Sequence, residues 1–450
     1  MNSMQLLPYK QQVSSLLRLG LPIVVGQLGM IILGLADTIM IGHHSTEELA
    51  AAAFVNNVFN LAIIFATGFS YGLTPLIGML QGGGNTQGIG RVFRNALAAN
   101  ASVAVLLTAV MYTVYCFVDK LGQPEELLPH IRPYFVLQLI SLLFIMLFNG
   151  FRQFAEGLTD TRTPMWILLG GNALNIFGNY LLIYGSFGFP EWGLFGAGVS
   201  TLVSRIVMLL VFIGVVAVAR RYKVYREAIL RSRFNRNDFM QLNALGWPIA
   251  LQMGMETAAF SLSAIMVGWL GSIPLAAHQI MISVSTIGFM VYYGMGAALA
   301  VRVSHFMGQK DFPNLRRAVN SGMGIILSLA IVASLFFYLA RTSIIYSFTE
   351  DHEVMVVVSS LIFSLIVYQF GDALQITFAN ALRGTTDVKP MMWIAFFSYF
   401  IVALPVGYLC GFTWGGGVVG VWVAFPAGLF TAGFLFWLRF RYRLQQLMKK

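Results

Sequence analysis

Long apolar runs, separated by short polar segments, fill most of the 450-residue chain. A helix that crosses the hydrocarbon core of a bilayer needs about 20 mostly apolar residues, whereas a spanning β-strand needs only about 9–11. Because the runs are much longer than a strand requires, the pattern predicts an all-α membrane protein. We expect twelve spanning helices, over residues 13–40, 49–80, 91–118, 130–156, 164–185, 194–219, 239–268, 275–307, 315–340, 354–383, 389–411 and 417–440.

The composition places the chain in the same class. Hydrophobic residues make up 58% and charged residues 10% of the sequence, and the mean hydropathy is +0.75, whereas a soluble domain carries about 25% charged residues. The chain lacks the polar surface of a water-exposed globule, and its apolar content excludes intrinsic disorder. The polar loops contain no Walker A, no HExxH and no paired Cys/His ligands, so we expect neither an enzyme nor a cofactor.

The net charge of +10 reflects membrane topology. If the N-terminus lies inside, the outer connections contain only Lys120, Arg132 and Arg341 as basic residues. Lys and Arg favour the cytoplasmic side, so we expect cytoplasmic termini, a multi-pass protein of the inner (cytoplasmic) membrane, and no nucleic-acid partner. The polar residues 1–18 lack the apolar core of a signal peptide, and we expect the first helix to be an uncleaved anchor.

An internal repeat divides the chain into halves. Leu-Gly-Leu-Pro-Ile at 19–23 returns as Leu-Gly-Trp-Pro-Ile at 245–249, an offset of 226 residues, and residues 157–160 resemble residues 384–387. Six helices in each half give two bundles of parallel orientation, an arrangement typical of rocking transporters. We expect an N-terminal lobe at 1–222, a basic cytoplasmic linker at 223–238 and a C-terminal lobe at 239–450, in a protein that acts as a monomer.

Only three acidic residues lie well inside the apolar runs, namely Asp37, Glu256 and Asp372. A charge at the bilayer centre costs at least about 2.5–3.5 kcal/mol on insertion scales. The repeat places Ser263 opposite Asp37 and Met30 opposite Glu256, so the fold builds the equivalent helices without a carboxylate. We therefore expect these acids to serve function rather than packing.

Polar side chains share helix faces with Asp37 in the first half. Gln27, Met30 and Asp37 align on the first helix, and Asn172, Asn175 and Asn179 form a stripe on the fifth. Amide oxygens beside a carboxylate suit a hard monovalent cation such as sodium. A seam of hydrogen bonds between helices explains the stripe equally well, and Thr201 on the sixth helix fits either interpretation.

The second half brings two carboxylates onto neighbouring faces. Gln252 and Glu256 align on the seventh helix, and Tyr368, Asp372 and Gln375 align on the tenth. If these helices face each other, two like charges share a low-dielectric site and favour binding of a proton or a cation. The alternative is a buried carboxylic acid that is hydrogen-bonded to a neighbour.

The sequence leaves open the roles of one arginine, two histidines and the many Met and Phe residues. Arg205, near mid-depth of the sixth helix, either pairs with a carboxylate or snorkels to the interface, and His278 and His305 favour structural roles. The 22 Met and 37 Phe residues are mostly lipid-facing or core residues, and those that line a cleft would accept flat organic cations with broad selectivity.

The chain resembles the multidrug and toxic compound extrusion (MATE) family, in its NorM-type branch. The resemblance covers nearly the whole chain. It rests on Leu-Gly-Leu-Pro-Ile at 19–23, Ala-Asp-Thr-Ile-Met-Ile-Gly at 36–42, Thr-Arg-Thr-Pro at 161–164, Ala-His-Gln-Ile at 277–280 and Leu-Arg-Gly at 382–384. It implies two six-helix lobes in a V-shaped fold, and antiport in which sodium or protons enter as cationic drugs leave.

The resemblance also implies site residues. It places one cation site in the C-lobe, at Glu256, Asp372 and Tyr368, and another in the N-lobe, at Asp37, Asn175, Asn179 and Thr201. The expected partners are small organic cations and membrane lipid, with a monovalent coupling ion as the only metal. The expected substrate cavity contains Gln27, Met30, Asn172, Gln252, Gln279, Phe289, Tyr292, Tyr293 and Gln375.

Three positions depart from the family pattern, and Arg205 is one of them. Asn179 and Phe289 stand where some relatives carry an acid and a tyrosine, which leaves the coupling ion and its lobe open, and Tyr292 or Tyr293 is a candidate substitute. The recurrence of amide and carboxylate oxygens favours sodium over protons. Two alternatives remain: a flippase for lipid-linked oligosaccharides, which would need a basic cavity, and a membrane scaffold without transport.

Overall fold

The chain forms helices over the residues that its computed structural model describes, 6–449. Twelve helical spans in that range are long and apolar enough to cross a membrane, which confirms the predicted number. Two short helices, α8 (Lys223–Arg231) and α12 (Arg341–Phe348), lie in connections. The spanning helices are α1 (Tyr9–His44), α2 (Thr46–Ser70) with α3 (Leu73–Gly82), α4 (Thr86–Cys116), α5 (Leu128–Gly157), α6 (Arg162–Ile183), α7 (Gly193–Val218), α9 (Arg236–Gly268), α10 (Ser272–Gln309), α11 (Phe312–Leu339), α13 (His352–Gly384), α14 (Lys389–Phe396) with α15 (Leu404–Tyr408), and α16 (Gly417–Trp422) with α17 (Ala424–Met448).

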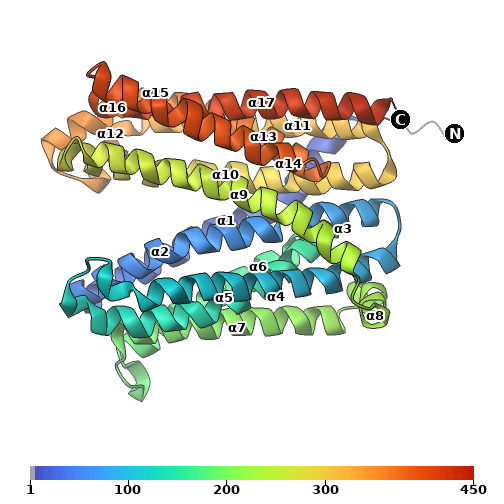
Figure 1. The fold of residues 1–450 in the computed structure, drawn as a ribbon, viewed down its shortest axis with the longest axis horizontal. Coiled ribbons are helices and arrows are strands. Elements are labelled where there is room, and N and C mark those ends of the chain that lie inside the picture. The colour runs from blue at the N-terminus through green and yellow to red at the C-terminus, as the bar shows by residue number, and fades with distance from the viewer. Residues whose placement is uncertain (1–5, 450) are drawn as a thin grey trace. The chain divides into compact units, whose positions relative to one another are not determined.

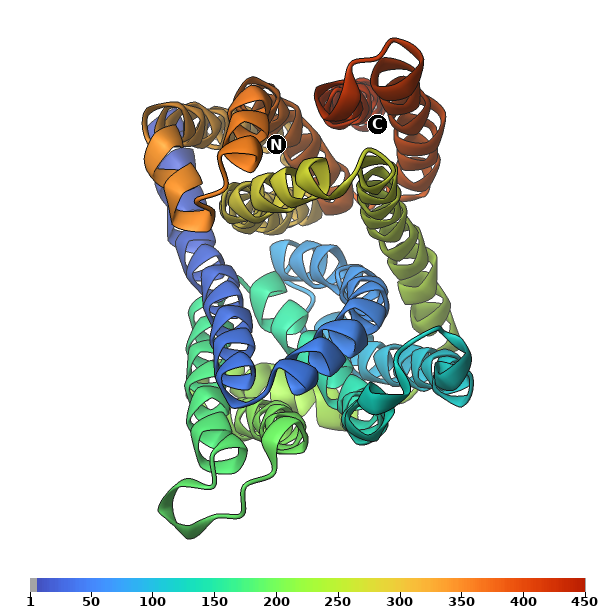
Figure 2. The same ribbon diagram turned by 90° about the vertical axis from the view of Figure 1, so that its left-hand side faces the viewer.

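The helices group into two packing units. Unit 1 joins the N-terminal segment up to Val24 to everything from Leu251 onward, and unit 2 is Val25–Ala250. Within unit 1, α13 packs against α10, α11 and α17, and within unit 2 the equivalent helix α5 packs against α2, α4 and α7 (Figure 1). Figure 2 adds that the segment between α6 and α7 projects from unit 2 as an irregular excursion.

The two unit boundaries are themselves related by the repeat. The cut after Val24 and the cut after Ala250 are 226 residues apart, the offset found in the sequence. The first part of α1 therefore packs with the second-half helices, and the first part of α9 packs with the first-half helices. The packing units differ in these two segments from the lobes expected at 1–222 and 239–450, which follow chain order.

Equivalent glycines allow the first parts of α1 and α9 to pack closely against other helices of their units. A Cβ on Gly246 would lie 2.6 Å from the ring of Phe69, and a Cβ on Gly20 would meet the sulfur of Met295. Gly246 is the repeat equivalent of Gly20, and Met295 is the equivalent of Phe69. The same contact is thus built twice, against a flexible side chain at Gly20 and against both a ring and the backbone at Gly246.

We expect Gly246→Ala to lower the free energy of unfolding by about 1–3 kcal/mol, the usual cost of overpacking. The new methyl would also lie 2.8 Å from the backbone oxygen of Phe69, which has little freedom to move. Gly20→Ala is the matched control, because the flexible Met295 side chain adapts to it. Chemical unfolding of the purified protein compares the two variants, and equal losses would contradict this explanation.

A matching turn ends the central helix of each unit. Thr159 and Thr386 adopt left-handed backbone conformations, with φ of 65° and 58°. The following residues repeat the hydrogen bonds, since Asp160 N donates to Ala155 O at 2.9 Å and Asp387 N donates to Leu382 O at 3.1 Å. The predicted likeness of residues 157–160 and 384–387 is therefore a likeness of structure.

Each turn presents its aspartate to a residue in the last spanning helix of its half or just after it. Asp160 accepts a hydrogen bond from the Tyr222 hydroxyl at 2.7 Å, and burial raises the pKa of that phenol above its usual value. Asp387 accepts from Arg439 Nε at 2.7 Å. The helix α17 continues to Met448, past the apolar run predicted to end at 440.

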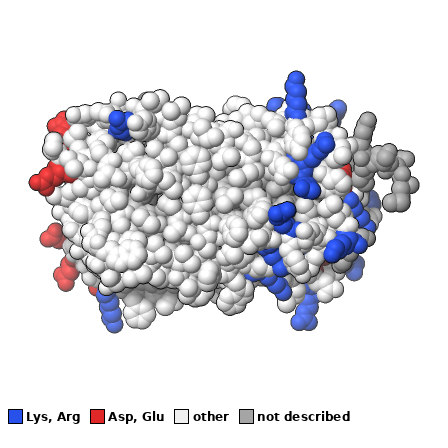
Figure 3. Space-filling model, turned by 90° about the horizontal axis from the view of Figure 1, so that it is seen from above, with Lys and Arg blue, Asp and Glu red and all other residues white. Residues whose placement is uncertain are grey.

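Charge is distributed unevenly along the helices. On the face that Figure 3 draws, most Lys and Arg side chains gather toward one end and the Asp and Glu side chains toward the other. This separation is the pattern that produces a positive-inside topology.

Candidate functional site

Asp372 is the most unusual buried group in unit 1. It lies on α13 with 0% of its surface exposed, and neither carboxylate oxygen has a hydrogen-bond partner among residues 6–449. A buried polar group without a partner costs about 1–3 kcal/mol, and more when it is charged. Such a group is stable only with a proton or with a cation as its partner.

Glu256 on α9 faces the same helix. Its Oε2 accepts hydrogen bonds from Gln252 Nε2 at 2.9 Å and from Gln375 Nε2 at 3.1 Å. Gln375 lies one turn after Asp372 on α13, and the two carboxyl groups interact electrostatically. The structure therefore brings together the two helix faces whose carboxylates the sequence pairs.

A buried arginine extends this cluster. Arg383 Nη2 donates to Gln252 Oε1 at 2.8 Å, so the Gln252 amide links a guanidinium on α13 to Glu256. A guanidinium and a carboxylate are thus joined through one amide side chain. Sequence reasoning did not connect Arg383 with this site, because the residue ends its helix beside a turn motif.

Aromatic and amide groups complete the surroundings of Asp372. Tyr368 lies one turn before it on α13 and is buried. The Tyr292 hydroxyl donates to Gln369 Oε1 at 2.8 Å, which leaves Gln369 Nε2 without a partner within the described part of the chain. A polar group without a partner thus also lies on α13 within one turn of this carboxyl.

Tyr399 joins the site from a different span. It is buried, and its phenol interacts electrostatically with both Glu256 and Asp372. It lies in the π-helical stretch Phe397–Ala403, and such stretches often occur at functional sites. The sequence offered no spacing signal for this residue.

The predicted first-half residues meet in unit 2. Asn179 Nδ2 donates to Asp37 Oδ1 at 2.6 Å. The Asn175 amide satisfies its neighbours best with its nitrogen toward Asp37 Oδ1, at 3.1 Å, and its oxygen toward the Thr201 hydroxyl, at 3.1 Å. All four residues are thus connected, and the Asn179 oxygen has no partner among the described residues.

Arg205 follows neither of the two interpretations left open by the sequence. Its guanidinium donates to Gln138 Oε1 at 3.1 Å and to the Ser141 hydroxyl, both on α5. It also interacts electrostatically with Asp37, but the two residues, both described, do not form an ion pair. Neutral oxygens hold the charge in place, and no spacing pattern in the sequence points to them.

The expected substrate-cavity residues occupy different environments. Gln27, Asn172 and Tyr292 are buried, Gln252 and Gln375 bind Glu256, and Phe289 stacks on Tyr293 with ring centroids 5.5 Å apart. Met30 and Gln279 are exposed. Their contact with a substrate stays a prediction. His278 accepts a hydrogen bond from the Trp422 indole at 3.2 Å, the structural role that the sequence favours.

Known proteins match nearly the whole length of this chain. The MatE family model matches residues 22–181 and 248–409, one segment in each half. The "Multidrug resistance protein NorM" of Photobacterium profundum is 30% identical over 448 residues, which cover 96% of each chain.

Solved structures share the fold. An outward-facing multidrug resistance MATE family transporter superposes with a TM-score of 0.88 at 20% identity, over 98% of this chain and 97% of the other. A mutant of the Vibrio cholerae MATE transporter VcmN gives a TM-score of 0.87 at 17% identity, over 98% and 99%. At these identities the two structures establish the helical arrangement that was expected.

Proposed function

The chain belongs to the MatE family, and on that premise we propose that it is a multidrug efflux transporter of the NorM type. In this proposal it exports cationic amphipathic compounds across the cytoplasmic membrane in exchange for an incoming cation. The observation that carries it is Asp372, a fully buried carboxyl without a hydrogen-bond partner in the described part of the chain, next to Glu256. A transporter of this kind needs an exchangeable charge, not a reactive group.

The exchange follows from simple electrostatics. A monovalent cation that reaches Glu256 and Asp372 offsets one negative charge of the pair, lowers the affinity of the site for an organic cation and so releases the organic cation outside. Loss of the small ion on the inner side restores the charge and the affinity. One inward charge against one outward charge is electroneutral, whereas a second inward ion adds about 2.3 kcal/mol per 100 mV.

Sodium is the coupling ion that the side chains favour. Asp37 and the free Asn179 oxygen in unit 2 are hard oxygen ligands, as are Glu256 and Asp372 in unit 1. Oxygen ligands of this kind suit alkali cations, while a proton needs only one carboxylate. We place both termini in the cytoplasm, on the side of the basic connections, and the transporter acts as a monomer without nucleic acid.

Asp37→Asn is expected to reduce drug export by about tenfold or more while the protein still folds. An amide at position 37 keeps a hydrogen-bond acceptor for Asn179 but removes the charge that a cation requires. Thr38→Val is the matched control, because among residues 6–449 the Thr38 hydroxyl donates to Gly34 O of its own helix and to no other group. Drug resistance of cells that express equal amounts of each variant measures the effect, and resistance equal to that of wild type in the Asp37 variant would make this carboxylate structural.

The proposed function is tested with purified protein in liposomes. A fluorescent organic cation is loaded, and a sodium gradient and a proton gradient are imposed separately. We expect the organic cation to move in the direction opposite to the imposed ion flow. Its movement should be faster with the sodium gradient than with the proton gradient. No movement under either gradient would leave a scaffold without transport, and movement of a lipid-linked oligosaccharide instead would establish the flippase.

A further inference from the structure

The connection between the two halves is strongly basic but contains apolar residues as well. Residues 220–236 hold seven basic residues and one acid, Glu227. Within them the structure forms α8 and, just before it, a short turn at Arg220–Tyr222. None of these residues belongs to the ion or substrate sites of the proposed function, so a general topological role is the only one assigned to their charge so far.

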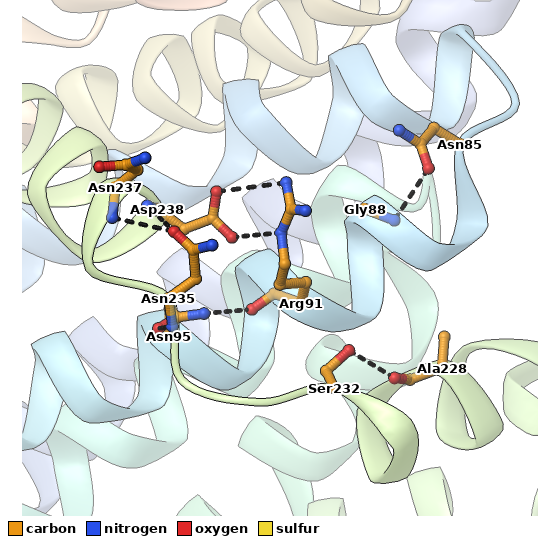
Figure 4. Close-up of polar contacts among 9 residues, drawn as sticks. All are labelled: Asn85, Gly88, Arg91, Asn95, Ala228, Ser232, Asn235, Asn237 and Asp238. Carbon is orange, nitrogen blue, oxygen red and sulfur yellow. Dashed lines mark hydrogen bonds and ion pairs between the residues drawn. The ribbon is translucent and has the colours of Figure 1, made fainter.

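One face of α8 is locked onto unit 2. A Cβ on Gly90 of α4 would lie 2.5 Å from the backbone of Ala228, so the two helices touch through their backbones. The Tyr225 hydroxyl donates to Gln81 Oε1 at 2.8 Å. Behind α8, Asn235 N donates to Asn95 Oδ1 at 2.9 Å (Figure 4).

An ion pair closes the same connection. Arg91 Nε of α4 donates to Asp238 Oδ2 at 2.6 Å, at the start of α9 (Figure 4). The Asn235 side chain accepts from the backbone N–H groups of Asn237 and Asp238 and so caps that helix. The segment is therefore a docked structural element with a fixed orientation rather than a loose tether.

The opposite face of α8 is exposed and has two kinds of residue. Lys223, Val224, Glu227, Leu230 and Arg231 fall on one side of the helix at helical spacing. Leu230 is 74% exposed and Val224 61% exposed. Phe234, directly after the helix, is 61% exposed beside the exposed Arg233. Apolar and basic residues on one exposed face are typical of helices that lie in a membrane interface.

Chain connectivity limits how far the exposed face of α8 can lie from the ends of the membrane-spanning helices. The last residue of α7 is Val218 and α8 begins at Lys223, so at most about 17 Å of extended chain separates them. Contact with Gly90 places α8 beside the first turns of α4, another spanning helix. Both constraints hold α8 at the end of the apolar spans, where the headgroup layer lies.

We propose that the exposed face of α8 binds anionic phospholipid headgroups of the adjacent leaflet. Lys223, Arg231 and Arg233 contact the phosphates, while Leu230, Val224 and Phe234 enter the acyl boundary. Exposed apolar side chains among the basic ones favour lipid over nucleic acid, which would leave them in water. The surface thus anchors the junction of the two halves to anionic lipid.

The test uses the full chain in bilayers. Leu230→Cys, in a background with Cys116→Ser and Cys410→Ser, carries an environment-sensitive fluorophore. Quenching by spin-labelled phosphatidylglycerol and by spin-labelled phosphatidylcholine gives the relative binding constant of the two lipids. We expect a clear preference for phosphatidylglycerol, which falls by at least about tenfold in a Lys223→Gln, Arg231→Gln, Arg233→Gln variant, since each surface charge is worth about fivefold.

A charge-matched control keeps the proposal falsifiable. Arg316→Gln, Arg441→Gln and Lys449→Gln together remove the same charge from exposed positions of unit 1 and should leave the preference unchanged. Equal quenching by both lipids in the unaltered segment would overturn the proposal. So would a preference that survives the α8 substitutions, or one that the control loses equally. Transport is not part of the readout, so failure here is distinguishable from failure of the proposed function.

Discussion

Asp372→Asn is expected to lower the rate of ion-driven efflux at least about a hundredfold without lowering the free energy of unfolding. The substitution removes the carboxylate that serves as the buried charge partner of the coupling cation. Loss of such a partner costs about 3–5 kcal/mol, and about 1.4 kcal/mol corresponds to a tenfold change in rate. Stability does not fall, because neither Asp372 oxygen has a protein partner to lose among the described residues. A residue that served packing would show the opposite pattern.

Two measurements on the same purified variant separate these roles: the efflux rate in liposomes and the unfolding midpoint in detergent. Asp119→Asn provides the matched control, since Asp119 forms a half-exposed ion pair with Arg132 and such pairs contribute about 0–1 kcal/mol. Efflux at the wild-type rate with Asn at position 372 would remove this carboxyl from the mechanism.

Glu256→Gln is expected to stop efflux equally but to lower stability as well. Gln252 and Gln375 both donate to Glu256 Oε2. A hydrogen bond to a charged group contributes about 1.5–3 kcal/mol, compared with about 0.5–1.5 for a neutral one, so the loss of charge should cost about 1–2 kcal/mol. The two acids of one site thus differ in their effect on stability although they share their effect on transport.

Chemical unfolding and liposome efflux again provide the two readouts, with the exposed Glu126→Gln as the control for the chemical change. A Glu256 variant that transports normally would exclude the residue from ion coupling. A Glu256 variant that is as stable as wild type would contradict the hydrogen bonds given to its carboxylate.

The twelve spans were predictable because the bilayer requires a minimum apolar length of about 20 residues from every helix that crosses it. The predicted run at 354–383 and the observed His352–Gly384 differ by a residue or two. The exchange at Val24 and Ala250 was not predictable, since a repeat offset shows which residues are equivalent but not which unit each packs with. Only the coordinates reveal the contact of Gly246 with Phe69.

The candidate site likewise contains residues that the sequence predicted and residues that it did not. Helical periodicity placed Gln252 with Glu256 and Asp372 with Gln375, because those relations lie within one helix. Tyr399 and Arg383 were missed, because they join the site through contacts between helices far apart in sequence. No spacing rule connects Tyr399 to residue 372, whereas in the folded chain the two groups interact electrostatically.

Competition between a small cation and an organic cation for unit 1 is the central claim. The direct measurement is the affinity of purified protein for a fluorescent organic cation, determined as sodium concentration and pH are varied separately. We predict that sodium, or protons, weaken binding in the wild type, and that the combined Glu256→Gln and Asp372→Asn variant loses this dependence. An affinity that neither ion changes in the wild type would contradict the account.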